Sequence, residues 1–230
     1  MIPMITSDNG KRLGDFFGFL VNESEKWERF TLGEKILSRR FQLNGISDLC
    51  DIYEKVALVD RLYRTNVYDI YSIAKHITKN TIDSRLKSRD LTLVDLIRKG
   101  HGIKTKKGNE RDFYSFATKY LSWHKPAEYP IFDNLIGNIL RKLNENDAYK
   151  FCELKLKGNA LRNYETLVSA LDTLIDRINL PAFRYKKIDI ALWFWAKVEE
   201  KERPEEKEDG FLKSARPRIE KEKTRLKVAL

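Results

Sequence analysis

The chain has 230 residues, which is enough for one large domain or for two smaller lobes. Its 42% hydrophobic content is ordinary for a globular protein, and its longest apolar run, Ile190–Ala196, is too short to cross a bilayer. The net charge of +10 favours a polyanionic partner, and the two isolated cysteines, Cys50 and Cys152, exclude a disulfide scaffold and a four-cysteine metal site.

Apolar residues recur at helical spacing along most of the chain, so nearly every segment predicts a helix. In chain order, the expected helices fall within residues 13–30, 32–43, 46–65, 66–79, 91–100, 115–124, 133–143 and 180–198, and a short basic helix could follow residue 213. No segment alternates as a strand does, and the sequence shows no hairpin signature and no internal repeat. The sequence therefore predicts an all-α fold.

Three segments interrupt the predicted helices. Residues 98–112 hold three glycines and several basic side chains, which suits either a solvated loop or a clamp for backbone phosphates. The sequence "HKPAEYP", residues 124–130, forms a second loop. From about Glu199 the chain is so densely charged that we expect a partly mobile tail that does not pack. Residues 1–196 carry +8 of the net charge of +10, so the excess belongs to the body of the protein.

Asp133 stands in the otherwise apolar stretch "YPIFDNLI". Pro130 ends the preceding loop and a helix begins at or just after Asp133, so the carboxylate can cap that helix. The apolar neighbours Tyr129, Ile131 and Phe132 would also exclude water and lower the local dielectric. A carboxylate in such a setting can stabilise a developing oxocarbenium ion and orient a water molecule. Both interpretations, cap and catalyst, are open on the residues alone.

The segment "SFATKYL…YPIFDNLIGNIL" resembles the catalytic region of the helix-hairpin-helix (HhH-GPD) DNA glycosylase superfamily. In that family, a helix with a Thr-Ala-like pair is followed by a loop and by a Pro-x-x-Asp sequence that enters the next helix. Ala117 lies 16 residues before Asp133, which agrees with the usual spacing. The resemblance implies that Asp133 is the catalytic aspartate, and it implies two helical lobes with a DNA-binding cleft between them.

The same register implies a role for the helix before Asp133. Ser115 stands where bifunctional members of the family carry a nucleophilic lysine. Because a serine cannot form a Schiff base with the sugar, the resemblance implies a monofunctional enzyme that leaves an intact abasic site. Lys119, one helical turn later, is the alternative nucleophile, and its simpler interpretation is a surface lysine or a phosphate contact.

Further side chains are implied to contact the substrate base. Tyr63 and Arg64 fall near the family's wedge, where a side chain fills the gap left by a flipped base. Alternatively, Tyr63 packs in the core and Arg64 is solvated. Trp123 and His124 end the helix before the catalytic loop and could stack on the base, although a histidine there can also interact with the helix dipole. Asn134, next to the aspartate, completes the set.

The family's phosphate-binding hairpin, which reads like Leu-Pro-Gly-x-Gly, has no direct counterpart. The aligned stretch, "GNERDFYSFA", contains only Gly108. A rebuilt hairpin would instead hold DNA phosphates through nearby polar side chains. The candidates for this role are Lys104, Lys106, Lys107, Asn109, Arg111 and Lys119.

We therefore expect residues 50–140 to form the lobe with the catalytic motif, residues 1–49 and 141–197 to form the second lobe, and residues 198–230 to form a charged, partly mobile tail. The expected protein is a cytoplasmic, monomeric, monofunctional DNA glycosylase that needs no metal or other cofactor and contacts no membrane. It would flip a damaged or modified base out of double-stranded DNA and hydrolyse its N-glycosidic bond.

The resemblance also suggests one conjecture about biological role, which is phage defence through removal of hypermodified cytosine from invading DNA. Two alternatives belong to other classes of function. The first is a non-catalytic helical nucleic-acid-binding protein that kept the fold and lost the chemistry. The second is a protein-interaction module whose positive charge only aids solubility.

Overall fold

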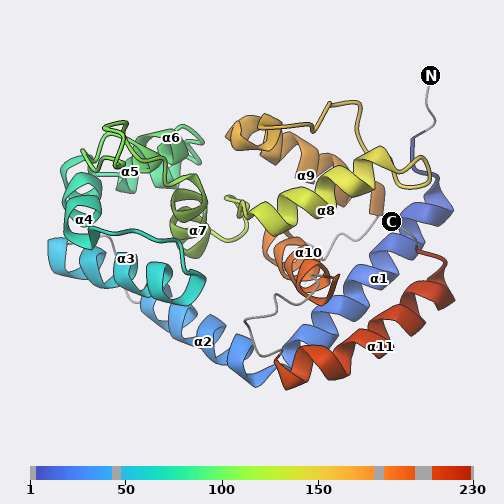
Figure 1. Ribbon diagram of the computed structural model, residues 1–230. Helices are drawn as coiled ribbons and strands as arrows, with labels where there is room; N and C mark the ends of the chain where they lie inside the picture. The colour runs from blue at the N-terminus through green and yellow to red at the C-terminus, as the bar shows by residue number, and fades with distance from the viewer. Residues whose placement is uncertain (1–3, 43–47, 179–183, 200–208, 229–230) are drawn as a thin grey trace. The chain divides into compact units, whose positions relative to one another are not determined.

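The computed structural model describes residues 4–42, 48–178, 184–199 and 209–228. Within these residues the regular structure is entirely helical, which confirms the predicted all-α fold (Figure 1). The helices are α1 (Ser7–Glu25), α2 (Glu28–Gln42), α3 (Leu49–Tyr63), α4 (Ile70–Lys79), α5 (Asp83–Lys87), α6 (Leu93–Arg98), α7 (Tyr114–His124), α8 (Asn134–Glu145), the short 3-10 helix η1 (Ala160–Arg162), α9 (Tyr164–Ile178), α10 (Tyr185–Glu199) and α11 (Gly210–Leu226).

The described residues divide into two compact units. We call residues 1–31 with 133–230 the terminal unit and residues 32–132 the central unit; α2 spans the division between them. The lobes expected from the sequence ended at residues 49 and 140. The division differs because α8 packs against α10, so Asp133 opens a helix of the terminal unit.

The terminal unit is built around α1, which packs against α9, α10 and α11. Thr6 caps α1, since its side chain accepts the amide of Asn9 at 3.2 Å. The buried face of the helix follows helical spacing, and Phe16 and Phe17 place their rings 5.0 Å and 6.2 Å from that of Trp195. Edge-to-face packing of this kind anchors the core.

Helix α11 comes from the charged tail, and the structure differs there from the expected unpacked segment. Ala215 and Ile219 are fully buried, and Figure 1 shows α11 lying alongside α1. Its charges are paired with the body of the unit, because Arg218 bonds the buried Glu23 at 2.8 Å. Ion pairing therefore lets a strongly charged segment pack. Residues 200–208 of the tail lie outside the described residues.

The central unit contains α3 to α7, with α3 packed against α4 and α7, and α6 packed against α7. Its core combines aliphatic side chains from α3, α4 and α6 with aromatic side chains from α7. Lys55 is also buried, where its ammonium lies 2.7 Å from the Asp51 carboxylate. This pairing satisfies a charge that would otherwise be costly to bury.

In the described part of the chain, no helix combines the length and the apolar character needed to cross a membrane.

Gly10 tests the close packing of α1 on α9. A Cβ atom at this position would lie 2.2 Å from the carbonyl oxygen of Arg177, a main-chain atom that cannot easily move. We expect Gly10→Ala to destabilise the protein by about 1–3 kcal/mol through overpacking. Gly18→Ala, in the same helix, is the matched control, because its Cβ would meet nothing within 4 Å and should stabilise the helix by up to about 1 kcal/mol. Urea unfolding of both variants measures the difference, and equal stabilities would contradict the close contact.

Candidate active site

Helix α7 carries four of the predicted site residues and is buried on nearly every side. Its buried positions are Tyr114, Phe116, Ala117, Thr118, Lys119, Tyr120, Leu121 and Ser122. A helix that is buried all round lies inside its unit instead of on its surface. The side chains that α7 presents are therefore held in fixed positions by their neighbours.

Lys119 is a buried residue of the central unit. The residue is only 2% exposed, and its ammonium donates to the Ser115 hydroxyl at 2.7 Å. It also lies 5.1 Å from the centre of the Tyr63 ring, within range of a cation–π interaction. The interpretation of Lys119 as a surface lysine is therefore wrong. Its amine reaches back one turn to the position where the resemblance implies a lysine in bifunctional relatives.

Trp123 and Tyr63 join this cluster from the ends of α7 and α3. The indole Nε1 of Trp123 donates to the Tyr63 hydroxyl at 3.2 Å, and that hydroxyl is 3.3 Å from Glu34 Oε1. Both aromatic residues are half-buried. The structure thus brings together Tyr63, Ser115, Lys119 and Trp123, all of which are candidate site residues on the sequence alone.

Thr118 fixes the chain immediately before Asp133. Its hydroxyl accepts the amide of Phe132 at 3.0 Å and lies 3.1 Å from the carbonyl oxygen of Ser115, to which it can donate. Both Thr118 and Phe132 are buried, so this bond is shielded from water. The loop that leads to Asp133 is therefore attached to α7 next to Ser115 and Lys119.

Asp133 is the N-cap of α8. Its Oδ1 accepts the amide of Leu135 at 2.9 Å, and its backbone is extended, as an N-cap requires. The residue is half-buried and follows the buried Ile131 and Phe132. A carboxylate is favoured at this end of a helix because the free amides and the helix dipole both attract negative charge.

His124 lies deeper than its place at the end of α7 suggested. Its ring packs 4.7 Å from that of Phe41 and 5.0 Å from that of Tyr120, and its Nε2 is buried without a hydrogen-bond partner among the described residues. Burial lowers the pKa of His124 to about 3; Lys55 lowers it as well, and Asp51 opposes the shift. Contact between Nε2 and a base would therefore require the ring to move.

Arg64 and Asn134 are exposed, unlike the residues around Lys119. Arg64 ends α3 in the left-handed conformation, with φ of 52°, and its side chain is in solvent. Asn134 is the first residue of α8 and stands next to Asp133. Both remain free to contact a ligand from outside.

The basic residues of the predicted phosphate clamp lie on a loop that turns back on itself. Lys104 and Glu110 form an isolated antiparallel bridge, and the Thr105 amide donates to the Asn109 carbonyl at 2.7 Å. The sequence showed no hairpin signature because the turn is too short to display alternation. The side chains of Lys104, Lys106, Lys107 and Asn109 are exposed, and that of Arg111 stacks on Tyr68 at 4.1 Å.

An ion pair closes the base of this loop. Arg98, at the end of α6, forms a bidentate pair with Asp112 and lies 4.4 Å from the centre of the Tyr114 ring. Asp112 also accepts the amide of Tyr114, the first residue of α7, at 3.1 Å. The hydrogen bonds that Arg98 donates to Asp112 raise the pKa of the Arg98 guanidinium, which outweighs the opposite effect of burial. The pair therefore joins α6, the loop and α7.

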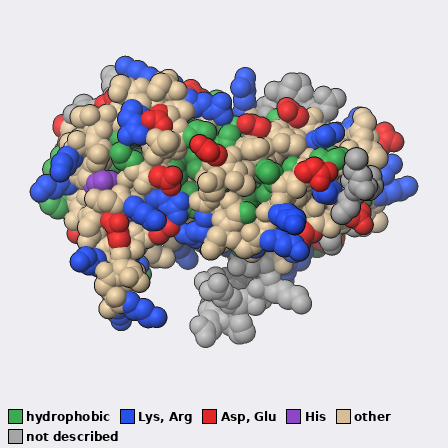
Figure 2. Space-filling model, turned by 90° about the horizontal axis from the view of Figure 1, so that it is seen from above, with side chains coloured by type: hydrophobic (Ala, Val, Ile, Leu, Met, Phe, Trp, Pro, Cys, Tyr) green, Lys and Arg blue, Asp and Glu red, His purple; other side chains and the backbone are tan. Residues whose placement is uncertain are grey.

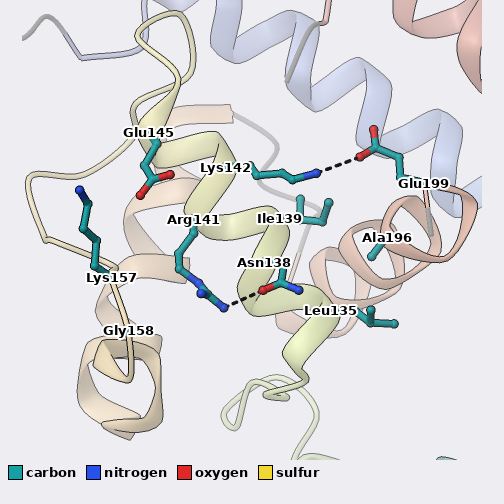
Figure 3. A pocket seen from close by; sticks show the side chains of 10 residues that line it. All are labelled: Leu135, Asn138, Ile139, Arg141, Lys142, Glu145, Lys157, Gly158, Ala196 and Glu199. Atoms are coloured by element: carbon teal, nitrogen blue, oxygen red, sulfur yellow. Dashed lines mark hydrogen bonds and ion pairs between the residues drawn. The ribbon is translucent and has the colours of Figure 1, made fainter. Parts of the chain in front are cut away.

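A pocket of about 500 Å³ lies along α8 in the terminal unit (Figure 3). Figure 3 shows Arg141 bonded to Asn138 and Lys142 paired with Glu199, at 2.7 Å and 3.6 Å. None of the residues predicted from the sequence lines this pocket. In the described residues, no group of His, Cys, Asp and Glu side chains is suited to hold a metal ion.

Charge on the molecular surface is mixed. On the face shown in Figure 2, Lys and Arg side chains are distributed over much of the surface, with Asp and Glu side chains among them. The loop formed by residues 99–111, which we call the basic loop, is a local exception, since Glu110 is its one acidic residue among several cations. The concentration of positive charge predicted from the sequence is therefore found on this loop.

Comparison with known proteins gives a relative in Haemophilus influenzae, described as an uncharacterized protein. It is 35% identical to this chain over 184 residues, which are 77% of this chain and 83% of the relative. The chain belongs to the family of this Haemophilus protein. The family description that matches, the HI_0787_N N-terminal domain, covers residues 19–128, and no solved structure matches.

The matched domain of the Haemophilus family includes residues 32–128 of the central unit, and hence the cluster around Lys119 and the basic loop. It ends before Asp133. The matched domain thus holds most of the central unit together with residues 19–31 of the terminal unit, and the candidate catalytic carboxylate lies beyond its end.

Several residues that shape the site were not predicted from the sequence. Thr118 holds the segment before Asp133, and Glu34 approaches Tyr63, but neither belongs to a recognisable motif. Gly100 and Gly102 both adopt positive φ, and their amides donate to Glu110. The Gly-x-Gly spacing in "KGHGI" could have drawn attention to the glycines, since only glycine adopts this conformation freely.

The buried ring of His124 should make stability depend on pH. In the folded protein the ring stays neutral down to about pH 3, whereas in the unfolded chain it takes up a proton near pH 6.5. The unfolded state binds the extra proton between these values, so the free energy of unfolding falls as the pH is lowered through this window. The slope attributable to His124 is up to about 1.4 kcal/mol per pH unit.

Comparison with His124→Phe isolates this effect, because phenylalanine fills the same space and does not titrate. Urea unfolding between pH 7.5 and 4.5 should show the wild type losing stability more steeply than the variant, while the other histidines contribute equally to both. Parallel curves would show that the ring is protonated in the folded protein.

Proposed function

We propose that this protein is a monofunctional DNA glycosylase, which flips a damaged or modified base and hydrolyses its N-glycosidic bond to leave an abasic site. The observation that supports the proposal is the environment of Asp133. Its carboxylate stands at the start of α8, directly after a buried apolar segment that Thr118 attaches to α7. A fixed carboxylate at a helix start suits stabilisation of positive charge that develops during a reaction.

In the proposed reaction, the bond between C1′ of the sugar and the base nitrogen breaks, and its electron pair leaves with the base. Positive charge develops on the sugar, and the Asp133 carboxylate stabilises it. A water molecule then adds its oxygen to C1′ and gives up a proton, for which the carboxylate is the nearest proposed acceptor. No covalent bond to the protein is formed, which makes the enzyme monofunctional.

The cluster on α7 would contact the flipped nucleotide. The half-buried faces of Tyr63 and Trp123 offer stacking surfaces, and the Ser115 hydroxyl offers a hydrogen bond. The ammonium of Lys119 would hold that hydroxyl in place and add a positive charge beside it. Asn134 would contact the base near Asp133, His124 would do so only after its ring moves, and Arg64 would fill the gap left in the duplex.

The basic loop would hold the DNA backbone. The amides of Gly100 and Gly102 and the side chains of Lys104, Lys106 and Lys107 would act on phosphates, with Asn109 and Arg111 beside them. Contacts to phosphates position a duplex without reading its sequence. They would therefore give affinity, and the base would be selected by the cluster on α7.

A non-catalytic nucleic-acid-binding protein is the second candidate, and the cap supports it. Asp133 already has a structural role as the N-cap of α8, which requires no chemistry. Under this alternative the basic loop would account for the whole function.

The substitution Asp133→Asn separates the cap from the chemistry. Asparagine caps a helix as well as aspartate does, so the melting temperature should change little, whereas loss of the charge should lower the rate of base release at least about 100-fold. The assay would use duplexes with damaged bases and phage DNA rich in modified cytosine, with alkali added afterwards to reveal abasic sites as strand breaks.

Asp48→Asn is the matched control, because Asp48 caps α3 through the Asp51 amide at 2.8 Å and has no proposed catalytic role. It should retain full base release. Breaks that appear without alkali would show a lyase instead, and borohydride trapping of wild type and Lys119→Met would then identify the amine. No breaks on any substrate, with salt-sensitive duplex binding retained, would establish the non-catalytic alternative.

A further inference from the structure

Residues 99–111 hold a carboxylate on two backbone amides. Glu110 Oε1 accepts the amide of Gly100 at 2.7 Å and the amide of Gly102 at 3.3 Å. Two amides that converge on one oxygen form a small anion-binding concavity. In the free protein, the anion in this concavity is supplied by the chain itself.

The concavity is built by the backbone around His101. Gly100 and Gly102 have φ of 82° and 79°, which side-chain-bearing residues rarely adopt. Between them, His101 is buried, and its Nδ1 accepts the amide of Ile103 at 3.1 Å. The proton of the neutral ring is then on Nε2, which donates to the carbonyl of Arg98 at 3.2 Å. With the ring fixed inside, both glycine amides remain directed at the same oxygen.

Closure of the loop does not depend on the Glu110 side chain. Backbone bonds cross the loop from Arg111 to Ile103 at 2.9 Å and from Thr105 to Asn109 at 2.7 Å. The pair between Arg98 and Asp112 closes its base. The carboxylate is therefore an addition to a loop that is already held together.

Charge around the concavity favours an external anion. Besides Glu110, the ionisable side chains of residues 99–111 that carry charge at neutral pH are all basic: Lys99, Lys104, Lys106, Lys107 and Arg111. The four lysines are exposed, and none of them forms an ion pair with a described residue. Desolvation raises the pKa of Glu110, but the amides of Gly100 and Gly102 together with His101 and His76 lower it, so the net pKa is below its ordinary value and the carboxylate is charged at neutral pH.

We propose that Glu110 is an internal competitor, which occupies the amides of Gly100 and Gly102 in the free protein and is displaced by a phosphate of the DNA backbone. Because one oxygen already uses both amides, the carboxylate and a phosphate oxygen cannot occupy them together. Displacement exchanges one charged acceptor for another, so its free-energy cost is small where phosphates are abundant. Weaker anions do not offset this cost, and Glu110 therefore prevents them from binding. The identity of the ligand in this inference rests on the proposed function, whereas the occupancy of the two amides by Glu110 is independent of it.

The substitution Glu110→Gln tests the competition. It removes the negative charge and keeps the size of the side chain, so the loop should remain folded. We expect the variant to bind an unmodified DNA duplex about three to ten times more tightly than wild type at about 0.1 M salt. Glu25→Gln is the matched control, since Glu25 is exposed at the end of α1 and the substitution changes the net charge equally. Equal affinities of the two variants would overturn the proposal.

A second measurement follows the amides directly. In titrations with inorganic phosphate, the NMR signals of the Gly100 and Gly102 amides should shift in Glu110→Gln at concentrations that leave those of wild type unchanged. Titration with the duplex should shift the same two signals in both proteins. Shifts with inorganic phosphate but none with the duplex would assign the amides to free phosphate and overturn the role in DNA binding; shifts with neither would overturn the site itself.

These outcomes are independent of base release. A protein that releases no base from any substrate can still show tighter duplex binding and shifted amides in Glu110→Gln, which would support the competition and reject the glycosylase. Base release that needs Asp133, with unchanged affinity in Glu110→Gln, would support the glycosylase and reject the competition.

Discussion

The bidentate pair between Arg98 and Asp112 is the interaction on which the central unit depends. It joins the end of α6 to the start of α7, and it closes the loop that carries the basic residues. Arg98 is 9% exposed, so removal of Asp112 would leave the Arg98 charge in a largely buried place, which is strongly unfavourable. Since α7 starts at this pair, the positions of Ser115, Lys119 and Trp123 along the helix are set by it. The packing of the central unit and the positions of the candidate site residues on α7 therefore depend on the same ion pair.

Asp133 joins a structural role to a proposed chemical one, and the two do not conflict. An N-cap must direct its side chain at free amides, and this fixes the carboxylate without using all of its oxygen lone pairs. A carboxylate that was mobile would have to be ordered in each reaction cycle, whereas a cap is ordered beforehand. The attachment of Phe132 to Thr118 restricts the preceding residue in the same way. The question left open by the sequence, cap or catalyst, is thus not a choice between exclusive answers.

Much of the helical fold could be predicted from the sequence because apolar periodicity is a local property. The periodicity of Leu13, Phe16 and Phe17 is enough to place their faces in a core, as the structure shows. The burial of Lys119 could not be predicted, because it depends on how α3 packs against α7. The helix within the charged tail was underestimated for the same reason: Arg218 is neutralised by Glu23, which is 195 residues away along the chain. Similarly, nothing local indicates that Glu110 lies on the amides of Gly100 and Gly102.

Lys119 and the exposed lysines of the basic loop differ in how they would act on a nucleic-acid ligand. Lys119 is buried beside a hydroxyl and an aromatic ring, so its charge acts at short range in a poorly solvated place. The lysines of the basic loop are in solvent, where salt screens them within about 10 Å at 0.1 M. Exposed lysines can therefore attract many polyanions but discriminate weakly between them. A ligand that also reaches Lys119 must insert a group of defined shape, and selectivity follows from that requirement more than from the net charge of +10.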